Sequence, residues 1–146
     1  MRSVVQRVSR ASVAIGGEVA GSIGPGLVAL VGIRRGDDEA ACRWLCDKLL
    51  RLRVFEDGEG KMNRTVAEAG GGILLVSQFT LYGDVRKGNR PGFDEAAPPE
   101  EAEPLYERMV AYLREVSPVP VASGRFRAEM SVELVNEGPV TILLER

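Results

Sequence analysis

The sequence ILLVSQFTL, residues 73–81, begins with an apolar run typical of a buried strand and continues with a group of polar residues. Four apolar residues follow the chain-breaking Gly70-Gly71-Gly72, which predicts a strand over Ile73–Leu81. Ser77, Gln78 and Thr80 place polar groups in this apolar setting, which is costly unless those groups are paired or used. Two interpretations remain open. The hydroxyls bond neighbouring backbone within the strand, or the segment is a strand end that binds a ligand.

The spacing of the two hydroxyl residues limits the second interpretation. Ser77 and Thr80 have opposite parity, so an unbroken strand sends their side chains to opposite faces. Only a bulge or a strand end aims both at one ligand. Neither hydroxyl has an evident general base nearby in the sequence, whereas backbone N–H groups at a strand end can form an oxyanion site.

A second polar interruption, Asn136-Glu137-Gly138-Pro139-Val140-Thr141, lies between two apolar runs near the end of the chain. Proline has no N–H to donate, so the Gly-Pro pair interrupts strand pairing. One interpretation is a simple turn between two strands. The other is a cis peptide, which costs an X-Pro bond only about 0.5–1 kcal/mol and presents a rigid wall without side chains to a small ligand.

The remaining elements are arranged irregularly along the chain. Strands are expected at Val4–Val8, Val13–Ile15, Leu27–Ile33, Val119–Ala122, Met130–Val135 and Val140–Leu144. Helices are expected at Asp38–Val54, with Asp37 as N-cap, and at Glu101–Val116, with Pro104 in the first turn. Between them, residues 82–99 form a long loop rich in Gly and Pro, and long loops in compact domains are usually functional. This order predicts an α+β fold, with antiparallel or mixed sheets and two main helices packed on them, in a single domain spanning 1–146.

Composition restricts the chemistry. The chain has 45% apolar and 27% charged residues, as expected for a globular protein, and it contains no histidine. The usual general base and the commonest metal ligand are therefore absent. Cys42 and Cys46 lie one helical turn apart, which favours two small buried residues over a metal pair or a nucleophile. No metal site and no cofactor are expected.

Charge and hydropathy bear on partners and location. The net charge of -2 argues against broad binding to nucleic acid, and DNA is not an expected partner. Local basic groups such as Arg86-Lys87 with Arg90 leave RNA binding through one patch open. The charged N-terminus argues against a signal peptide, and the lack of a long apolar run argues against a membrane span. A cytoplasmic protein is therefore expected.

Taken together, the motifs resemble those of the D-aminoacyl-tRNA deacylases across the whole chain. The segments that carry the resemblance are Gln6-Arg7-Val8, Arg10-Ala11-Ser12-Val13, Gly60-Lys61-Met62-Asn63, Ser77-Gln78-Phe79-Thr80-Leu81, Gly88-Asn89-Arg90-Pro91 with Phe93, Ser123-Gly124-Arg125-Phe126, and Asn136-Glu137-Gly138-Pro139-Val140-Thr141. The Ser-Gln-Phe-Thr and Asn-x-Gly-Pro-x-Thr motifs in this order are highly specific. Gly92 departs from the pattern, because many members carry Ser after Arg-Pro.

The resemblance implies hydrolysis of the ester between a D-amino acid and the 3′ end of tRNA, and of glycine mischarged on alanine tRNA, by a homodimer. It assigns Ser77, Gln78, Phe79 and Thr80 to the catalytic site. Gly138 and Pro139 would form a cis Gly-Pro motif that rejects L-amino acids in the partner subunit's site. Arg7, Asn136, Thr141 and Met130 would contact the substrate. The alternative is a noncatalytic RNA-binding module that uses the same pocket.

Overall fold

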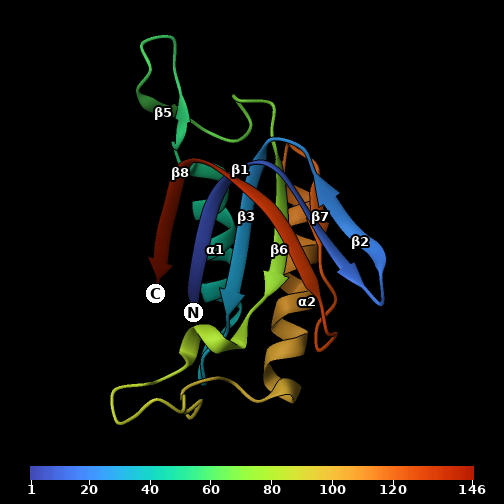
Figure 1. Cartoon of the computed structure of the whole chain (residues 1–146), viewed down its shortest axis with the longest axis vertical. Helices are drawn as coiled ribbons and strands as arrows, with labels where there is room; N and C mark the ends of the chain where they lie inside the picture. The colour runs from blue at the N-terminus through green and yellow to red at the C-terminus, as the bar shows by residue number, and fades with distance from the viewer.

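The computed structural model describes residues 1–146. The chain forms one α+β domain in which a mixed sheet is packed against two helices (Figure 1). The sheet comprises β1 (Arg2–Ile15), β2 (Glu18–Ile23), β3 (Gly26–Gly32), β6 (Gly72–Ser77), β7 (Val121–Ser123) and β8 (Ser131–Glu145). The helices are α1 (Glu39–Arg51) and α2 (Pro99–Val116), with a short 3-10 helix η1 (Phe79–Tyr82) after β6. A separate hairpin, β4 (Phe55–Glu56) and β5 (Met62–Arg64), projects from the body.

The order of the strands explains the continuous apolar runs in the sequence. The main path is β2-β1-β3-β6-β7, and β8 pairs with the free side of β1. β6 runs parallel to both β3 and β7, while the other pairs are antiparallel. In Figure 1 both helices lie behind the sheet, while the long β1/β8 ribbon arches over its other side. Because β3 and β6 are thus covered on both faces, nearly all their side chains are apolar.

Two apolar clusters correspond to these two faces. The larger joins Leu27, Ile73 and Leu75 of the sheet to buried helix residues such as Leu45 and Met109. The smaller joins Val28, Leu74 and Val76 to Val8, Ala11 and Val13 inside the curled β1 strand. Cys42 and Cys46 are buried free thiols, which confirms their prediction as core residues.

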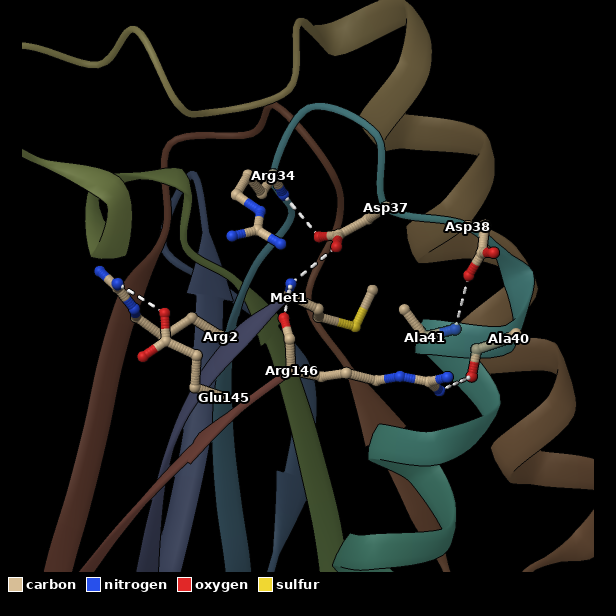
Figure 2. A network of polar contacts seen from close by, with 9 residues as sticks. All are labelled: Met1, Arg2, Arg34, Asp37, Asp38, Ala40, Ala41, Glu145 and Arg146. Carbon is tan, nitrogen blue, oxygen red and sulfur yellow. Dashed lines mark hydrogen bonds and ion pairs between the residues drawn. The ribbon is translucent and has the colours of Figure 1, made fainter.

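The start of α1 differs from the prediction by one residue. Asp38, not Asp37, is the N-cap, and its side chain accepts a hydrogen bond from the Ala41 N–H. Asp37 instead binds two donors outside the helix. Its carboxylate accepts from the Met1 amine at 2.7 Å and from the Arg34 N–H at 2.7 Å (Figure 2). The helix also ends at Arg51, before the expected Val54, because Val54 and Phe55 leave it as buried residues on the way to the projecting hairpin.

The same hydrogen-bond network joins the start of β1 to the end of β8. The Met1 amine also donates to the Arg146 carbonyl at 3.0 Å, and Arg146 donates to the Ala40 carbonyl of α1 at 2.7 Å (Figure 2). Arg2 pairs with Glu145 at 2.8 Å and donates to the Leu81 carbonyl at 2.8 Å. The two chain ends and η1 are therefore held together at one end of the sheet.

Four further predicted boundaries were wrong. The first two expected strands are one strand, β1, and the Ile73–Leu81 strand stops at Ser77, where η1 takes over. Helix α2 starts at Pro99, so Pro104 lies beyond the first turn, inside the helix. The last two expected strands form the single strand β8, and Gly138-Pro139 lies within it at a register shift instead of at a turn.

Neither helix combines the length and the apolar composition that a membrane-spanning helix needs.

Candidate functional site

The Ser77–Thr80 segment lies where β6 ends. The Gln78 N–H donates to the Val31 carbonyl at 2.7 Å, and this is the last backbone hydrogen bond of the segment to β3. The chain then turns into η1, with the Leu81 N–H bonded to the Gln78 carbonyl at 3.2 Å. Gly32 permits this turn, since a Cβ there would lie 3.1 Å from the Leu81 Cβ and 3.2 Å from the Gln78 carbonyl oxygen. A strand end was one of the two arrangements that the sequence allowed.

Helix η1 supplies main-chain donors at this point. As the first residues of the helix, Phe79 and Thr80 have N–H groups without an intrahelical acceptor. Phe79 is 57% exposed, and its ring centroid lies 5.0 Å from that of Phe93 in the long loop. The strand end thus offers free N–H groups beside an aromatic pair.

A cavity of about 630 Å³ opens beside this strand end. Ser77, Gln78 and Phe79 line one side, and Met130 lines another, so four predicted site residues share this cavity. The other walls come from the carboxyl end of β3 and the residues after it, from the 93–102 segment and from the 126–132 segment. Tyr106 supports the Phe126 wall, with centroids 6.0 Å apart, while its hydroxyl donates to the Leu75 carbonyl at 3.0 Å. Burial raises the pKa of Tyr106 to about 12.

Thr80 is placed differently from the other three members of its motif. It is exposed and does not line the cavity, and its hydroxyl accepts a hydrogen bond from the Gln78 side-chain amide. An amide N–H donates a proton and cannot remove one, so this contact does not activate the hydroxyl as a nucleophile. The site can therefore offer oxyanion stabilisation by main-chain N–H groups more readily than covalent catalysis.

The other predicted residues gather at the apex of the β1/β8 ribbon. Arg7 is 7% exposed and donates to the carbonyls of Val54 at 2.6 Å and Glu137 at 3.2 Å. Asn136 donates to the Thr141 hydroxyl at 3.4 Å and accepts from the Val140 N–H at 3.4 Å, which closes the loop around Gly138-Pro139. The Gly138-Pro139 peptide bond is cis, and Gly138 has φ +121°.

This apex and the cavity are separate within one chain. Ser77 pairs with Val31, and Val31 with Ser3, whereas Gly138 lies opposite the Gln6–Val8 part of β1. Four residues along β1 correspond to about 13 Å, in addition to the strand spacings between β8 and β6. Arg7, Asn136, Gly138, Pro139 and Thr141 are accordingly absent from the cavity lining.

Several wall residues were not predicted as site residues. They include Arg35, Phe93, Ala96, Pro98, Phe126 and Arg127. Phe93 and Phe126 do belong to segments that carried the family resemblance, and that was the signal available for them. The apolar residues between them gave none, because only the folded topology brings these loops to one strand end.

The fold and site define a small α+β protein with a ligand-sized cavity at a strand end, served by main-chain donors and without histidine. The chain belongs to the D-Tyr-tRNA(Tyr) deacylase family, whose model matches residues 4–145. A D-aminoacyl-tRNA deacylase of Symbiobacterium thermophilum is 64% identical over 99% of this chain and 95% of its own. One of Carboxydothermus hydrogenoformans is 58% identical over 99% of each. The predicted resemblance, and with it the class of enzyme, a hydrolase, are confirmed.

Solved structures share the fold over the full length. A structure described as a c-Myc DNA unwinding element binding protein has a TM-score of 0.93 and 45% identity, covering 100% of this chain and 99% of its own. Another, described as a probable eukaryotic D-amino acid tRNA deacylase, has a TM-score of 0.81 at 20% identity, with 98% and 97% covered. Because the identity is only 20%, the second comparison shows a shared fold and nothing more.

Proposed function

We propose that this protein hydrolyses the ester bond of D-aminoacyl-tRNA and thereby removes D-amino acids, and glycine mischarged on alanine tRNA, before translation uses them. Family membership supports the reaction. The single structural observation that carries the proposal is the cavity of about 630 Å³ at the Ser77–Phe79 strand end. Its size and mainly apolar walls suit one aminoacylated nucleoside. A cytoplasmic location, where aminoacyl-tRNA is made and used, belongs to the same proposal.

The reaction proceeds with main-chain help. The N–H group of Phe79, which lines the cavity, donates to the carbonyl oxygen as it gains negative charge, while a water molecule assisted by the neighbouring 2′-hydroxyl attacks the carbonyl carbon. The ester C–O bond then breaks, the 3′ oxygen of the adenosine takes up the proton that the water gave up, and the free amino acid is released. The Gln78 side-chain amide donates a hydrogen bond to the Thr80 hydroxyl, and this contact positions the Ser77–Thr80 segment. An ester of this kind is already activated, so oxyanion stabilisation and positioning supply enough of the rate without a histidine base.

Selection against L-amino acids is assigned to Gly138 and Pro139 of a second copy. Their position at the ribbon apex, away from their own cavity, supports a role in the partner's cavity. The outer side of β8 offers an apolar surface for this homodimer, since Leu143 is 73% exposed and Val135 is 37% exposed. Arg7 holds the apex in place through the Glu137 carbonyl, and Asn136 and Thr141 brace it from within. Met130 contacts the substrate from the cavity wall.

The test is hydrolysis of D-tyrosyl-tRNA and L-tyrosyl-tRNA by the purified protein. We expect the D-ester to be cleared under conditions that leave the L-ester intact. Comparable hydrolysis of both enantiomers would contradict the assignment of Gly138 and Pro139. A noncatalytic nucleic-acid-binding module remains the second candidate, and the description of one solved relative as a DNA unwinding element binding protein favours keeping it. Tight RNA binding without any turnover of the D-ester would select that candidate.

A further inference from the structure

The cavity at the strand end has an uneven distribution of charge. Twelve of its 18 lining residues are hydrophobic, and the charged ones are Arg35 and Arg127. The two arginines come from different walls. Arg35 follows β3 next to the long loop, and Arg127 lies in the segment between β7 and β8. Both arginines are exposed residues at the border of the cavity, and no acidic side chain lines it to match their positive charge.

Neither guanidinium is neutralised by the protein. The Arg35 Nε donates to the main-chain carbonyl of Asp94 at 3.1 Å, which orients the group and leaves its two terminal nitrogens free. Arg127 has no side-chain hydrogen bond, and neither arginine has a carboxylate within 4.0 Å. Arg86, in the neighbouring loop, provides the contrast. It pairs with Asp84 at 2.7 Å and lowers the pKa of that carboxyl to about 2.

The backbone of Arg127 also has an unusual conformation. Its φ is +60°, the only positive φ among the non-glycine residues of the chain. This left-handed conformation is unfavourable for arginine and costs on the order of 1–3 kcal/mol unless the surroundings impose it. Such residues are concentrated at ligand sites, and this one carries a cation to the wall of the cavity.

We propose that Arg35 and Arg127 form a phosphate subsite that grips the RNA backbone next to the terminal nucleoside. The inference rests on the proposed function and deepens it. An apolar cavity flanked by two free guanidinium groups suits a ligand with a flat nucleoside body and a phosphodiester at one end. Arginine presents two parallel N–H donors that match the oxygens of a phosphate. The subsite binds the phosphodiester that links the last two nucleotides, and it distinguishes a tRNA end from a free aminoacyl nucleoside.

The kinetic test compares two esters, D-tyrosyl-tRNA and D-tyrosyl-adenosine, which lacks the phosphate. The variants are Arg35→Gln, Arg127→Gln and the double variant, with Arg43→Gln as the control for loss of one exposed positive charge on α1. We expect each single variant to lose roughly tenfold to a hundredfold more kcat/KM on the tRNA ester than on the adenosine ester, the scale of one charge-assisted hydrogen bond. We also expect the salt slope of log KM to fall by about 0.7 per lost contact. Equal losses on the two esters, or no loss on tRNA beyond that of Arg43→Gln, would overturn the subsite.

A binding test separates this inference from the proposed function. An unacylated RNA trinucleotide CCA and free adenosine are titrated into wild type and variants by calorimetry. The subsite predicts tighter binding of the trinucleotide to wild type, and predicts that the double variant loses this advantage. If wild type hydrolyses neither ester but binds in this way, the proposed function fails and the subsite stands. Inorganic phosphate is the third ligand, and binding of phosphate as tight as that of the trinucleotide would assign the site to a free anion and refute the RNA contact.

Discussion

Replacement of Thr80 by alanine is the sharpest test of how the ester is cleaved. The side chain lies outside the cavity, and its hydroxyl has one protein partner, the Gln78 amide. Losing one neutral hydrogen bond costs about 0.5–1.5 kcal/mol, which corresponds to about twofold to thirteenfold in rate. Losing a covalent nucleophile costs far more. A thousandfold drop corresponds to about 4 kcal/mol of transition-state stabilisation. The two roles therefore differ by about two orders of magnitude.

The assay is kcat/KM for D-tyrosyl-tRNA, measured on Thr80→Ala and on a matched control, Thr65→Ala. Thr65 also makes hydroxyl hydrogen bonds, to Glu68, but is not part of the cavity wall. We expect the control to match wild type and Thr80→Ala to remain within about tenfold of it. Thermal unfolding of both variants shows that the fold is intact. A loss near a thousandfold in folded Thr80→Ala would refute the main-chain mechanism and identify Thr80 as the nucleophile.

Three other perturbations test separate features. Gly138→Ala forces an alanine to φ +121° with its Cβ 2.8 Å from the Val140 Cγ2 and 3.1 Å from the Arg7 Nη2, so we expect urea unfolding to show roughly 1–3 kcal/mol lower stability. In the proposed dimer the added methyl group would obstruct the partner's cavity, so we also expect loss of D-ester hydrolysis. Wild-type stability would contradict the crowding at the apex, and wild-type hydrolysis would contradict the placement of Gly138 at the partner's cavity. Burial raises the pKa of Cys42 to about 11 and of Cys46 to about 12, so both thiols should resist labelling by a disulfide reagent at pH 8 until the protein unfolds. Because the raised pKa values favour the protonated thiols in the folded state, the stabilisation they give is complete below the unfolded-state pKa of 9.0 and declines as pH rises toward 11. Unfolding measured from pH 7 to 11 tests this decline. Because no histidine is present and no three Cys, Asp or Glu side chains gather as ligands, deacylation should survive EDTA and dialysis, and a divalent ion that restores lost turnover would disprove this.

The helices and buried strands were predictable because local pattern determines them. Apolar positions at helical spacing identified α1 and α2, and continuous apolar runs identified β3 and β6. The errors arose where a distant part of the chain decides the outcome. Asp37 has the chemistry of an N-cap, but the Met1 amine and the Arg34 N–H engage it, and the cap passes to Asp38. Nothing local to Asp37 could reveal the position of Met1.

The same reasoning applies to β8 and to the cavity. Gly138-Pro139 looked like a turn or a cis peptide, and in the structure the strand continues through it because β1 pairs with both flanks at a shifted register. A strand end within Ser77–Thr80 was one of the alternatives that the sequence left open, although the expected strand ran on to Leu81. Arg35 and Arg127 were not predictable as site residues, because an isolated arginine in a loop is usually solvated surface. Only the parallel pairing of β3, β6 and β7 brings the loops that carry them to one cavity.

The separation of the two conspicuous motifs determines how the proposed function depends on assembly. One chain contains the complete cavity, including Ser77, Phe79 and Met130, so chemistry at the ester requires no second copy. The same chain holds Gly138 about 13 Å further along β1, fixed there by the two hydrogen bonds of Arg7 to the Glu137 and Val54 carbonyls. A segment tied to its own chain in this way does not swing down to its own cavity. Rejection of L-amino acids by Gly138 therefore requires a partner subunit, and under the proposed function stereochemical selection depends on dimerisation more strictly than hydrolysis does.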